Sequence, residues 1–281
     1  MTIRIATDST CDLPQEVIRE LKIAVVPLYI NIGDKGYLDG VDISRQSFYS
    51  NLPSYPTHPT TGVPGTEAFT QAYEELATEG ATEILSIHIS KALSAMIDIA
   101  KMAAAGFQKA AVTALDGGQL SLGTGFQVET AARMALEGKS MTEILAKLED
   151  MTSRLFVTAR LDTLEFLRRS GRMNGVVSGI GSLLSLKPLL KMSNGVSASE
   201  MVRTTKKAEE RLVKLLKERL PVERFALLHT NAAEAAEAFR ARIADLIPKE
   251  KIYSMDITPV IGAHIGPGAV GYAILSEKSL E

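Results

Sequence analysis

The stretch Ile3-Arg-Ile-Ala-Thr-Asp-Ser-Thr-Cys-Asp-Leu-Pro14 joins an apolar run to a polar loop and then to a proline. Residues 3–6 have the pattern of a strand buried on both faces, which is typical of a parallel sheet. Proline is favoured in the first turn of a helix, so a helix is expected from Pro14 onward. A strand, a loop and a helix in this order predict the first unit of an open α/β sheet, where ligands bind at the strand–helix loops. Ser9 is therefore a candidate ligand contact, although helix capping by this loop explains the same residue types.

The same alternation continues through the first half of the chain. Apolar runs predict strands at residues 3–6, 24–30, 84–89 and 110–114. Between them, amphipathic patterns opened by Ser, Thr or Pro predict helices at residues 14–21, 44–51, 66–78, 93–105 and 120–137. We therefore expect an N-terminal parallel α/β domain, which we place at residues 1–151.

The pattern changes after a further predicted helix at residues 141–150. Strands are predicted at residues 154–158, 189–193, 196–202, 225–229, 252–255 and 270–274. Asn194-Gly195 separates two of these runs and is a strong hairpin signal, so part of this sheet should be antiparallel. We expect a C-terminal α+β domain at residues 152–281 with a mostly antiparallel sheet, packed closely on the first because no flexible linker separates them.

Composition excludes several classes of function. With 31 basic and 33 acidic residues among 281, the formal net charge is -2, which argues against a nucleic-acid partner. No apolar run approaches the roughly 18 residues of a membrane span, and the first residues lack the features of a signal peptide. Cys11 is the only cysteine, which excludes a cysteine-based zinc cage and is compatible with a reducing cytoplasm. We expect a cytoplasmic protein without a metal site.

Several polar residues stand out within this apolar pattern. Thr60 and Thr61 lie in a proline-rich segment that presents hydroxyls at low entropic cost. Ser94 lies where a predicted strand gives way to a helix, a place that favours anions but where a serine also serves as a cap. These hydroxyls suit a carboxylate ligand.

The second half adds a histidine, a glycine and an arginine to the candidates. His264 and Gly266 belong to Gly262-Ala-His-Ile-Gly-Pro-Gly268, which we interpret as a glycine-rich turn before the last strand that allows close approach to a ligand oxygen. Arg172 lies beyond Gly171 and is free to face a ligand. The apolar segment at residues 176–190 has the composition to line a lipophilic tunnel or to form ordinary core.

The motifs Asp8-Ser-Thr-Cys-Asp-Leu-Pro14, Pro59-Thr-Thr-Gly-Val-Pro64, Leu93-Ser94, Gly171-Arg172, Lys187-Pro188 and Gly262-Ala-His-Ile-Gly-Pro-Gly268 occur in the order seen in DegV proteins. The chain resembles a DegV-family fatty-acid-binding protein over nearly its whole length. This resemblance implies a long-chain fatty acid held between the two domains, with its carboxylate bound by Thr61 and Ser94 and with His264 close by. It also places the basic residues Arg172 and Arg203 near the head group or a partner surface.

Bacterial members of this family carry acyl chains for a separate fatty acid kinase, which converts the carboxylate to an acyl phosphate. The resemblance therefore implies a carrier rather than an enzyme, with no cofactor other than the bound fatty acid and with a transient membrane contact as a further option. The absence of nucleotide-binding glycine motifs agrees with ATP being brought by the partner.

Three departures from the family pattern and two alternatives accompany this interpretation. Polar residues that are common in the family are replaced here at Gly62-Val63, Ala95-Met96 and Gly117. The first two departures lie in the expected head-group region, and Met96 could reshape the pocket.

One alternative function is an esterase or thioesterase with Ser94 as nucleophile and His264 as base, although no G-x-S-x-G elbow is present. The other is a small polar ketone bound as in dihydroxyacetone kinase subunits, which requires a small polar pocket.

Overall fold

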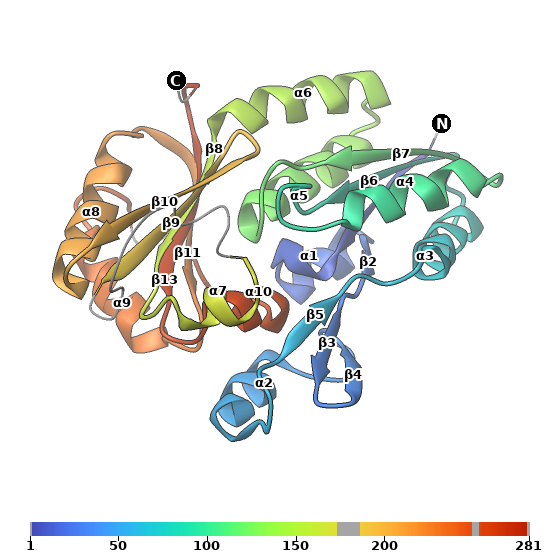
Figure 1. Ribbon diagram of the computed structural model, residues 1–281. Helices are drawn as coiled ribbons and strands as arrows, with labels where there is room; N and C mark the ends of the chain where they lie inside the picture. Colours follow the sequence, from blue (N-terminus) through green and yellow to red (C-terminus); the bar gives the residue numbers. More distant parts are fainter. Residues whose placement is uncertain (1, 173–185, 249–252, 280–281) are drawn as a thin grey trace.

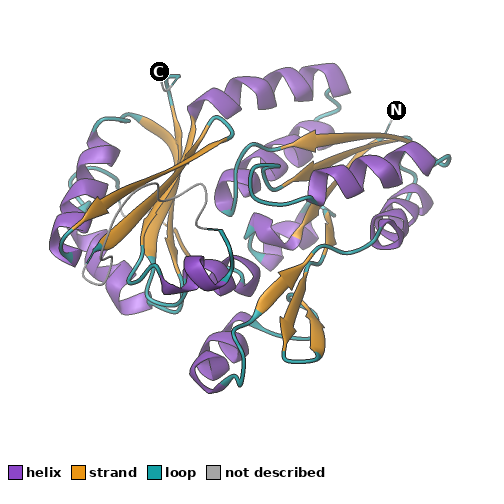
Figure 2. Cartoon of the chain, viewed as in Figure 1, coloured by secondary structure: helices purple, strands orange, loops and turns teal. Residues whose placement is uncertain are grey.

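The computed structural model describes residues 2–172, 186–248 and 253–279, which form two sheet-based domains side by side (Figures 1 and 2). The N-terminal sheet is parallel, as predicted, with the strand order β2-β1-β6-β7. Its strands are β1 (Ile3–Asp8), β2 (Ala24–Val26), β6 (Glu83–His88) and β7 (Ala111–Asp116). The helices around it are α1 (Gln15–Glu20), α3 (Thr66–Thr78), α4 (Met96–Gly106) and α5 (Leu122–Leu136).

The prediction of one strand over residues 24–30 is wrong in its extent. β2 ends at Val26, and β3 (Tyr29–Ile32) leaves the parallel sheet to pair with β4 (Lys35–Leu38) and β5 (Thr60–Gly62) in a small antiparallel sheet. Pro27 lies at the break, and a proline has no N–H to donate to a strand ladder. This small sheet and α2 (Arg45–Asn51) form the lower part of the molecule in Figure 1.

The C-terminal sheet has the order β10-β9-β8-β13-β11-β12 and is antiparallel except for the β11–β12 pair. Its strands are β8 (Leu155–Arg160), β9 (Lys187–Ser193), β10 (Val196–Val202), β11 (Val222–His229), β12 (Tyr253–Asp256) and β13 (Val270–Ser276). The predicted hairpin is confirmed, because β9 and β10 pair through Asn194 and Gly195, whose φ angles are 48° and 74°. These positive values suit the tight turn that Asn-Gly favours.

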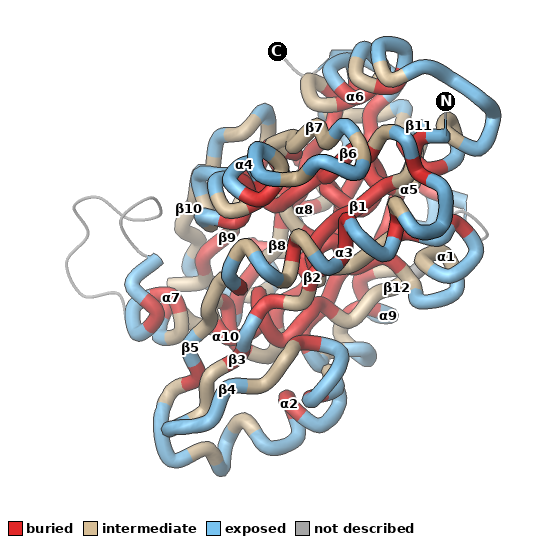
Figure 3. Tube along the Cα trace, turned by 90° about the vertical axis from the view of Figure 1, so that its right-hand side faces the viewer, coloured by how far each residue is buried: buried red, intermediate tan, exposed pale blue. Residues whose placement is uncertain are grey.

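Helices cover one face of this sheet, and the other face meets the N-terminal domain. α8 (Thr205–Lys217) and α9 (Ala233–Arg242) pack on the outer face through a core that includes Leu212, Phe239 and Tyr272. The inner face shares a continuous apolar cluster with α5 and β1. Figure 3 shows the resulting buried stretches running through the strands of both domains. The domains therefore pack tightly against one another.

Three further α-helices occur in the described part of the chain. α6 (Met141–Arg154) opens with a Ser140–Glu143 capping box, and the predicted domain boundary after residue 151 falls in its last turn. α7 (Glu165–Arg169) packs on α10 (Pro259–Ile265). Within the described residues, no helix combines the length and the apolar character needed to cross a membrane.

The segment at residues 262–268 is only partly the turn that we predicted. Residues 262–265 are the end of α10, and the turn is confined to Gly266 through Gly268, whose two glycines have φ angles of 76° and 85°. Thr258 caps α10 and Pro259 occupies its first turn, so a helix-start signal was present upstream of the glycines.

Candidate ligand-binding site

A cavity of about 400 Å³ lies between the two domains. The N-terminal domain contributes β5 and the loops after β1, β6 and β7, while the C-terminal domain contributes β8, β9, β10 and α10. Because the loops follow the carboxyl ends of parallel strands, the cavity lies where open α/β sheets bind ligands. Four of the candidates from the sequence line it together: Thr61, Ser94, Arg172 and His264.

Most of the cavity wall is aliphatic. Side chains from both domains face each other across it, among them Leu28, Ile89, Leu93, Leu161, Ile261 and Leu228. Burying an apolar chain against such a wall stabilises a complex by ~0.8 kcal/mol per methylene group. The wall is therefore suited to the tail of an amphiphile rather than to a small polar ketone.

Three hydroxyls on this wall direct their protons away from the cavity. Thr10 donates to the carboxylate of Asp8, and Ser121 donates to that of Asp12 at 2.6 Å. Thr158 donates to the carbonyl oxygen of Leu190 at 2.7 Å. Each of these residues has used its single hydroxyl proton, so none offers a donor to a ligand.

Thr61 and His264 form a polar pair at the cavity, with Oγ1 and Nε2 2.9 Å apart. Burial, the positive charge of Arg172 and the proximity of His58 lower the pKa of His264 to about 4, so its imidazole is neutral at pH 7. A neutral imidazole and a hydroxyl carry one proton each, and their mutual hydrogen bond uses only one of the two. The other nitrogen, Nδ1, is buried and has no partner among the described residues. In the tautomer whose Nε2–H donates to Thr61, the threonine hydroxyl proton remains available to a bound anion.

Ser94 and Arg172 add to this polar region. Ser94 Oγ accepts a hydrogen bond from the Met96 N–H at 3.3 Å, and its own proton has no acceptor among the described residues. Arg172 is exposed, donates to the Ser170 carbonyl oxygen at 2.7 Å and lines the cavity with a charged guanidinium group. Two available donors beside a cation are suited to a carboxylate.

The other four candidates do not line the cavity. Ser9 Oγ accepts from the Leu28 N–H at 3.2 Å, and Thr60 is exposed on β5. Gly266 is required for packing, because a Cβ atom there would overlap the ring of Phe166. Arg203 is exposed just after β10. The part of segment 176–190 before residue 186 lies outside the described residues, while Leu190 itself lines the cavity.

The departures from the family pattern have different outcomes. Val63 lines the cavity, whereas Met96, the first residue of α4, is fully buried in the core and is not among the cavity-lining residues. Gly117 packs against the His88 carbonyl oxygen and the side chain of Gln127, where a Cβ atom would be crowded. Only the first departure therefore acts directly on the ligand site.

The hydrolase alternative requires Ser94 to donate to His264, and the structure pairs His264 with Thr61 instead. A Ser–His–Asp series does occur, with His88 between Ser86 Oγ at 2.7 Å and Asp8 Oδ2 at 3.0 Å. All three side chains are fully buried, so this series is structural. Hydrogen bonds from His88, Thr10 and the Ile89 N–H outweigh the effect of burial and lower the pKa of Asp8.

Sequence reasoning missed most of the apolar wall. Ile257, Ile261 and Ile265 line the cavity with His264, and their spacing of four residues places them on one face of α10 and the turn before it. This helical periodicity was present in the sequence, but the glycines of the segment directed attention to a turn. Strands β8 and β9 contribute their residues only because the tertiary fold places them opposite the N-terminal loops.

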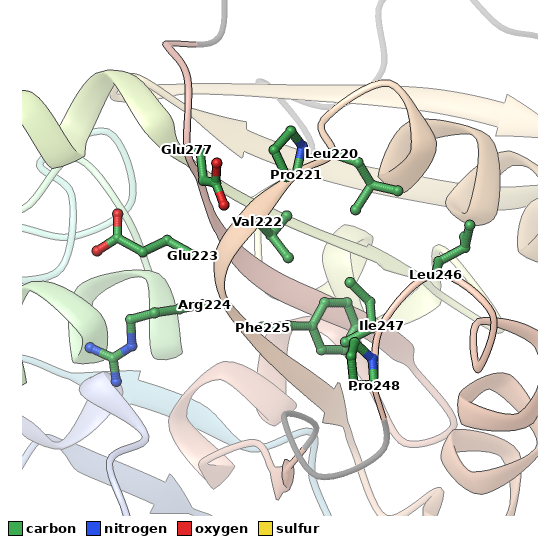
Figure 4. Close-up of a pocket in the computed structure, with 10 residues that line it drawn as sticks. All are labelled: Leu220, Pro221, Val222, Glu223, Arg224, Phe225, Leu246, Ile247, Pro248 and Glu277. Atoms are coloured by element: carbon green, nitrogen blue, oxygen red, sulfur yellow. The ribbon is translucent and has the colours of Figure 1, made fainter.

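A second hollow of about 520 Å³ lies at the start of β11, bordered by Leu246, Ile247 and Pro248 (Figure 4). Two of its three charged residues, Glu223 and Arg224, point away from the apolar ones and have partners elsewhere. Glu223 pairs with Arg154 at 2.8 Å, and Arg224 pairs with Glu129 and covers the ring of Phe126. No convergent polar groups among the described residues distinguish this hollow as a binding site.

Comparison with known proteins agrees with this geometry. The family model "Uncharacterised protein, DegV family" matches residues 2–277. A DegV domain-containing protein of Deinococcus radiodurans is 37% identical over 279 residues, covering 98% of each chain. A fatty-acid-binding DegV family protein from Thermus thermophilus has 35% identity and a TM-score of 0.89, covering 98% of this chain and 100% of its own. DegV of Bacillus subtilis, a fatty acid binding protein, has 30% identity and a TM-score of 0.89, covering 99% and 100%. The chain therefore belongs to the DegV family.

Proposed function

We propose that this protein binds one long-chain fatty acid in the cavity between its domains and presents the carboxylate to a separate kinase. The acyl chain occupies the aliphatic wall, and the carboxylate lies at Thr61, Ser94 and His264. The protein then serves as a carrier that keeps the chain out of water while the head group stays accessible.

The observation that carries this proposal is the division of hydroxyl protons around the cavity. Thr10, Ser121 and Thr158 donate away from it, whereas Ser94 and the Thr61–His264 pair keep protons for a ligand. An anion is favoured only where donors remain, and an apolar chain is favoured where they do not. This division predicts the orientation of the fatty acid as well as its class.

The exposure of the polar end supports the proposed kinase step. Arg172, which lines the cavity, is itself exposed, so a partner can reach the head group from that side. Transfer of a phosphoryl group from ATP to the carboxylate would form an acyl phosphate and release ADP, with the nucleotide held by the partner. Exposed Arg203 is a candidate for the surface that the partner contacts.

We place this phosphoryl transfer in the cytoplasm, where the thiol of Cys11 would stay reduced. A brief contact of the protein with a membrane surface would allow the acyl chain to leave.

The first test is the identity of the ligand. Protein purified from a bacterial host is denatured and extracted with organic solvent, and the extract is analysed by mass spectrometry. A stoichiometric fatty acid supports the proposal, and an empty extract from protein that also fails to bind added palmitate contradicts it.

The second test separates carboxylate recognition from tail burial. Affinities are measured for palmitate and for hexadecan-1-ol, which have equal chain lengths but different head groups. We expect palmitate to bind more tightly, by about tenfold or more, because hydrogen bonds to a charged group contribute about 1.5–3 kcal/mol. Equal affinities would show that the polar end does not recognise a carboxylate.

The kinase step is tested by trapping its product. The protein loaded with palmitate is incubated with ATP and a purified bacterial fatty acid kinase, and hydroxylamine converts any acyl phosphate to a hydroxamate. A hydroxamate that forms only when both proteins are present supports presentation to a partner. Its absence with a kinase that is active on its own carrier contradicts this half of the proposal.

A further inference from the structure

A buried carboxylate joins the two domains next to the ligand cavity. The side chain of Asp12 is fully buried and accepts hydrogen bonds from the Thr258 N–H at 2.9 Å and from Ser121 Oγ at 2.6 Å. It also pairs with Arg45 at 2.9 Å, and the Arg45 side chain is 29% exposed. One carboxylate of the N-terminal domain therefore contacts the backbone of the C-terminal domain directly.

Residues 256–258 receive further contacts from the same side. Arg45 donates to the Asp256 carbonyl oxygen, and the Tyr49 hydroxyl donates to that of Ile257 at 3.0 Å. Thr258 Oγ1 donates to the buried carboxylate of Asp39. We call the group of Asp12, Asp39, Arg45 and Tyr49 around residues 256–258 the domain junction.

The domain junction lies at the start of the helix that carries His264. α10 begins at Pro259, directly after Thr258, and its residues Val260, Ile261, His264 and Ile265 line the cavity. Tyr49 also packs against Gly262, where any side chain would overlap its hydroxyl. A shift of residues 256–258 would therefore move α10, and His264 with it, relative to Thr61.

The same carboxylate also holds the opposite wall of the cavity. Ser121 lines the cavity and has φ and ψ angles of 50° and -142°, a sparsely populated conformation that costs a non-glycine residue about 1–3 kcal/mol. Its hydrogen bond to Asp12 is one of the contacts that hold this residue in place. Asp12 thus contacts Ser121 on the N-terminal side of the cavity and Thr258, which leads into α10 on the C-terminal side.

We propose that Asp12 is a positioning residue that sets the place of α10 against the N-terminal domain and so keeps His264 within hydrogen-bonding distance of Thr61. The effect of Asp12 on ligand affinity rests on the proposed binding of a fatty acid, whereas its effect on the position of His264 does not. Asp12 does not line the cavity, so it acts through Thr258 and α10 rather than on the ligand.

The test without ligand uses the titration of His264. In the wild type, burial and the charges of Arg172 and His58 lower its pKa to about 4. Burial raises the pKa of Asp12 to about 6, so its carboxyl group is already neutral where His264 titrates. Asp12→Ala therefore gives a clearer test than Asp12→Asn, because it removes the hydrogen bonds with Thr258 and Ser121 at every pH. If α10 moves, His264 gains water, and its pKa rises toward the ordinary value of about 6.5. The pKa is measured from the ring resonances of His264 by two-dimensional NMR between pH 3 and pH 8.

Three further variants make the result specific. Arg45→Gln removes the cation that contacts Asp12 and the Asp256 carbonyl oxygen from a partly exposed position. It is also expected to raise the pKa of His264, and it keeps the test open even if Asp12→Ala does not fold. The double variant removes the uncompensated charge that Arg45→Gln leaves, so it should be more stable than Arg45→Gln alone. Asp42→Ala is the matched control, because the Asp42 carboxylate also accepts a backbone hydrogen bond, from the Leu38 N–H, but lies between β4 and α2 outside the domain junction. It should leave the His264 titration unchanged.

The outcomes separate this inference from the proposed function. A rise in the pKa of His264 in Asp12→Ala and Arg45→Gln, but not in Asp42→Ala, supports the positioning role. Titration near 4 in both junction variants would overturn it, whatever the ligand. Binding then gives the second measurement: we expect a loss of about tenfold in affinity for palmitate and a smaller loss for hexadecan-1-ol. If the wild type binds neither compound, the proposed function fails while the titration still tests Asp12.

Discussion

Replacing Thr61 by Val tests the polar end of the cavity most directly. Valine has the shape of threonine but lacks the hydroxyl, so the substitution removes the hydrogen bond to His264 with little change in volume. A hydrogen bond to a charged group contributes about 1.5–3 kcal/mol, which corresponds to a roughly 10- to 150-fold loss of affinity. Because Thr61 is only half-buried, we expect the lower part of this range. The substitution also leaves both nitrogens of His264 without a protein partner, since Nδ1 already has none among the described residues.

The assay is titration calorimetry with palmitate and with hexadecan-1-ol, together with calorimetric unfolding of each protein. Thr60→Val is the matched control, because Thr60 is the neighbouring residue on β5, is exposed and does not line the cavity. We expect weaker palmitate binding and a lower melting temperature only for Thr61→Val. Wild-type affinity for palmitate in Thr61→Val would refute the assignment of the head-group site to the Thr61–His264 pair.

Three other predictions concern the tail, the histidine and α10. Affinity should rise about fourfold for each methylene added to a saturated fatty acid until the cavity is filled, and Ala198→Phe on the cavity wall should move this limit to shorter chains. Displacement of a fluorescent fatty acid measures both effects. Equal affinities along the series of chain lengths would contradict burial of the tail. The pKa of His264 is about 4 in the folded protein, below its unfolded value of about 6.5, so the unfolded chain binds a proton first as the pH falls. The contribution of His264 to stability is therefore lost between about pH 6.5 and pH 4. The unfolding free energy of the wild type minus that of His264→Gln should shrink over this range, and a constant difference would argue against a buried neutral imidazole. Gly262→Ala should destabilise the protein by about 1–3 kcal/mol, because the new methyl group would overlap the Tyr49 hydroxyl. Gly138→Ala, at an open position with positive φ, gives the cost of backbone strain for comparison. Equal losses in melting temperature for the two variants would show that α10 can move without cost.

The local features of the fold could be predicted from the sequence because they depend on neighbouring residues. The apolar run at residues 3–6 followed by a polar loop and Pro14 predicts the strand and helix found there. Asn194 and Gly195 predict the hairpin, since few other residues adopt positive φ angles so readily. The ordered motifs also indicated the family, and with it Thr61, Ser94, Arg172 and His264 as candidate ligand residues, all four of which line the cavity. The break at Pro27 was visible in the same way but was overlooked in the apolar run around it.

Only the tertiary structure decided how these residues act together. Thr61 and His264 are 203 positions apart, and their hydrogen bond depends on the packing of β5 against α10. Whether a hydroxyl serves the ligand or the protein depends on its acceptor, and no local pattern shows that Ser121 donates to Asp12 while Ser94 keeps its proton. The depressed pKa of His264 likewise arises from burial and from Arg172, which folding brings near it from a distant part of the chain. Hydrogen bonding and desolvation act over a few ångströms in space rather than along the sequence, so the cavity and its Thr61–His264 pair exist only once the two domains have packed.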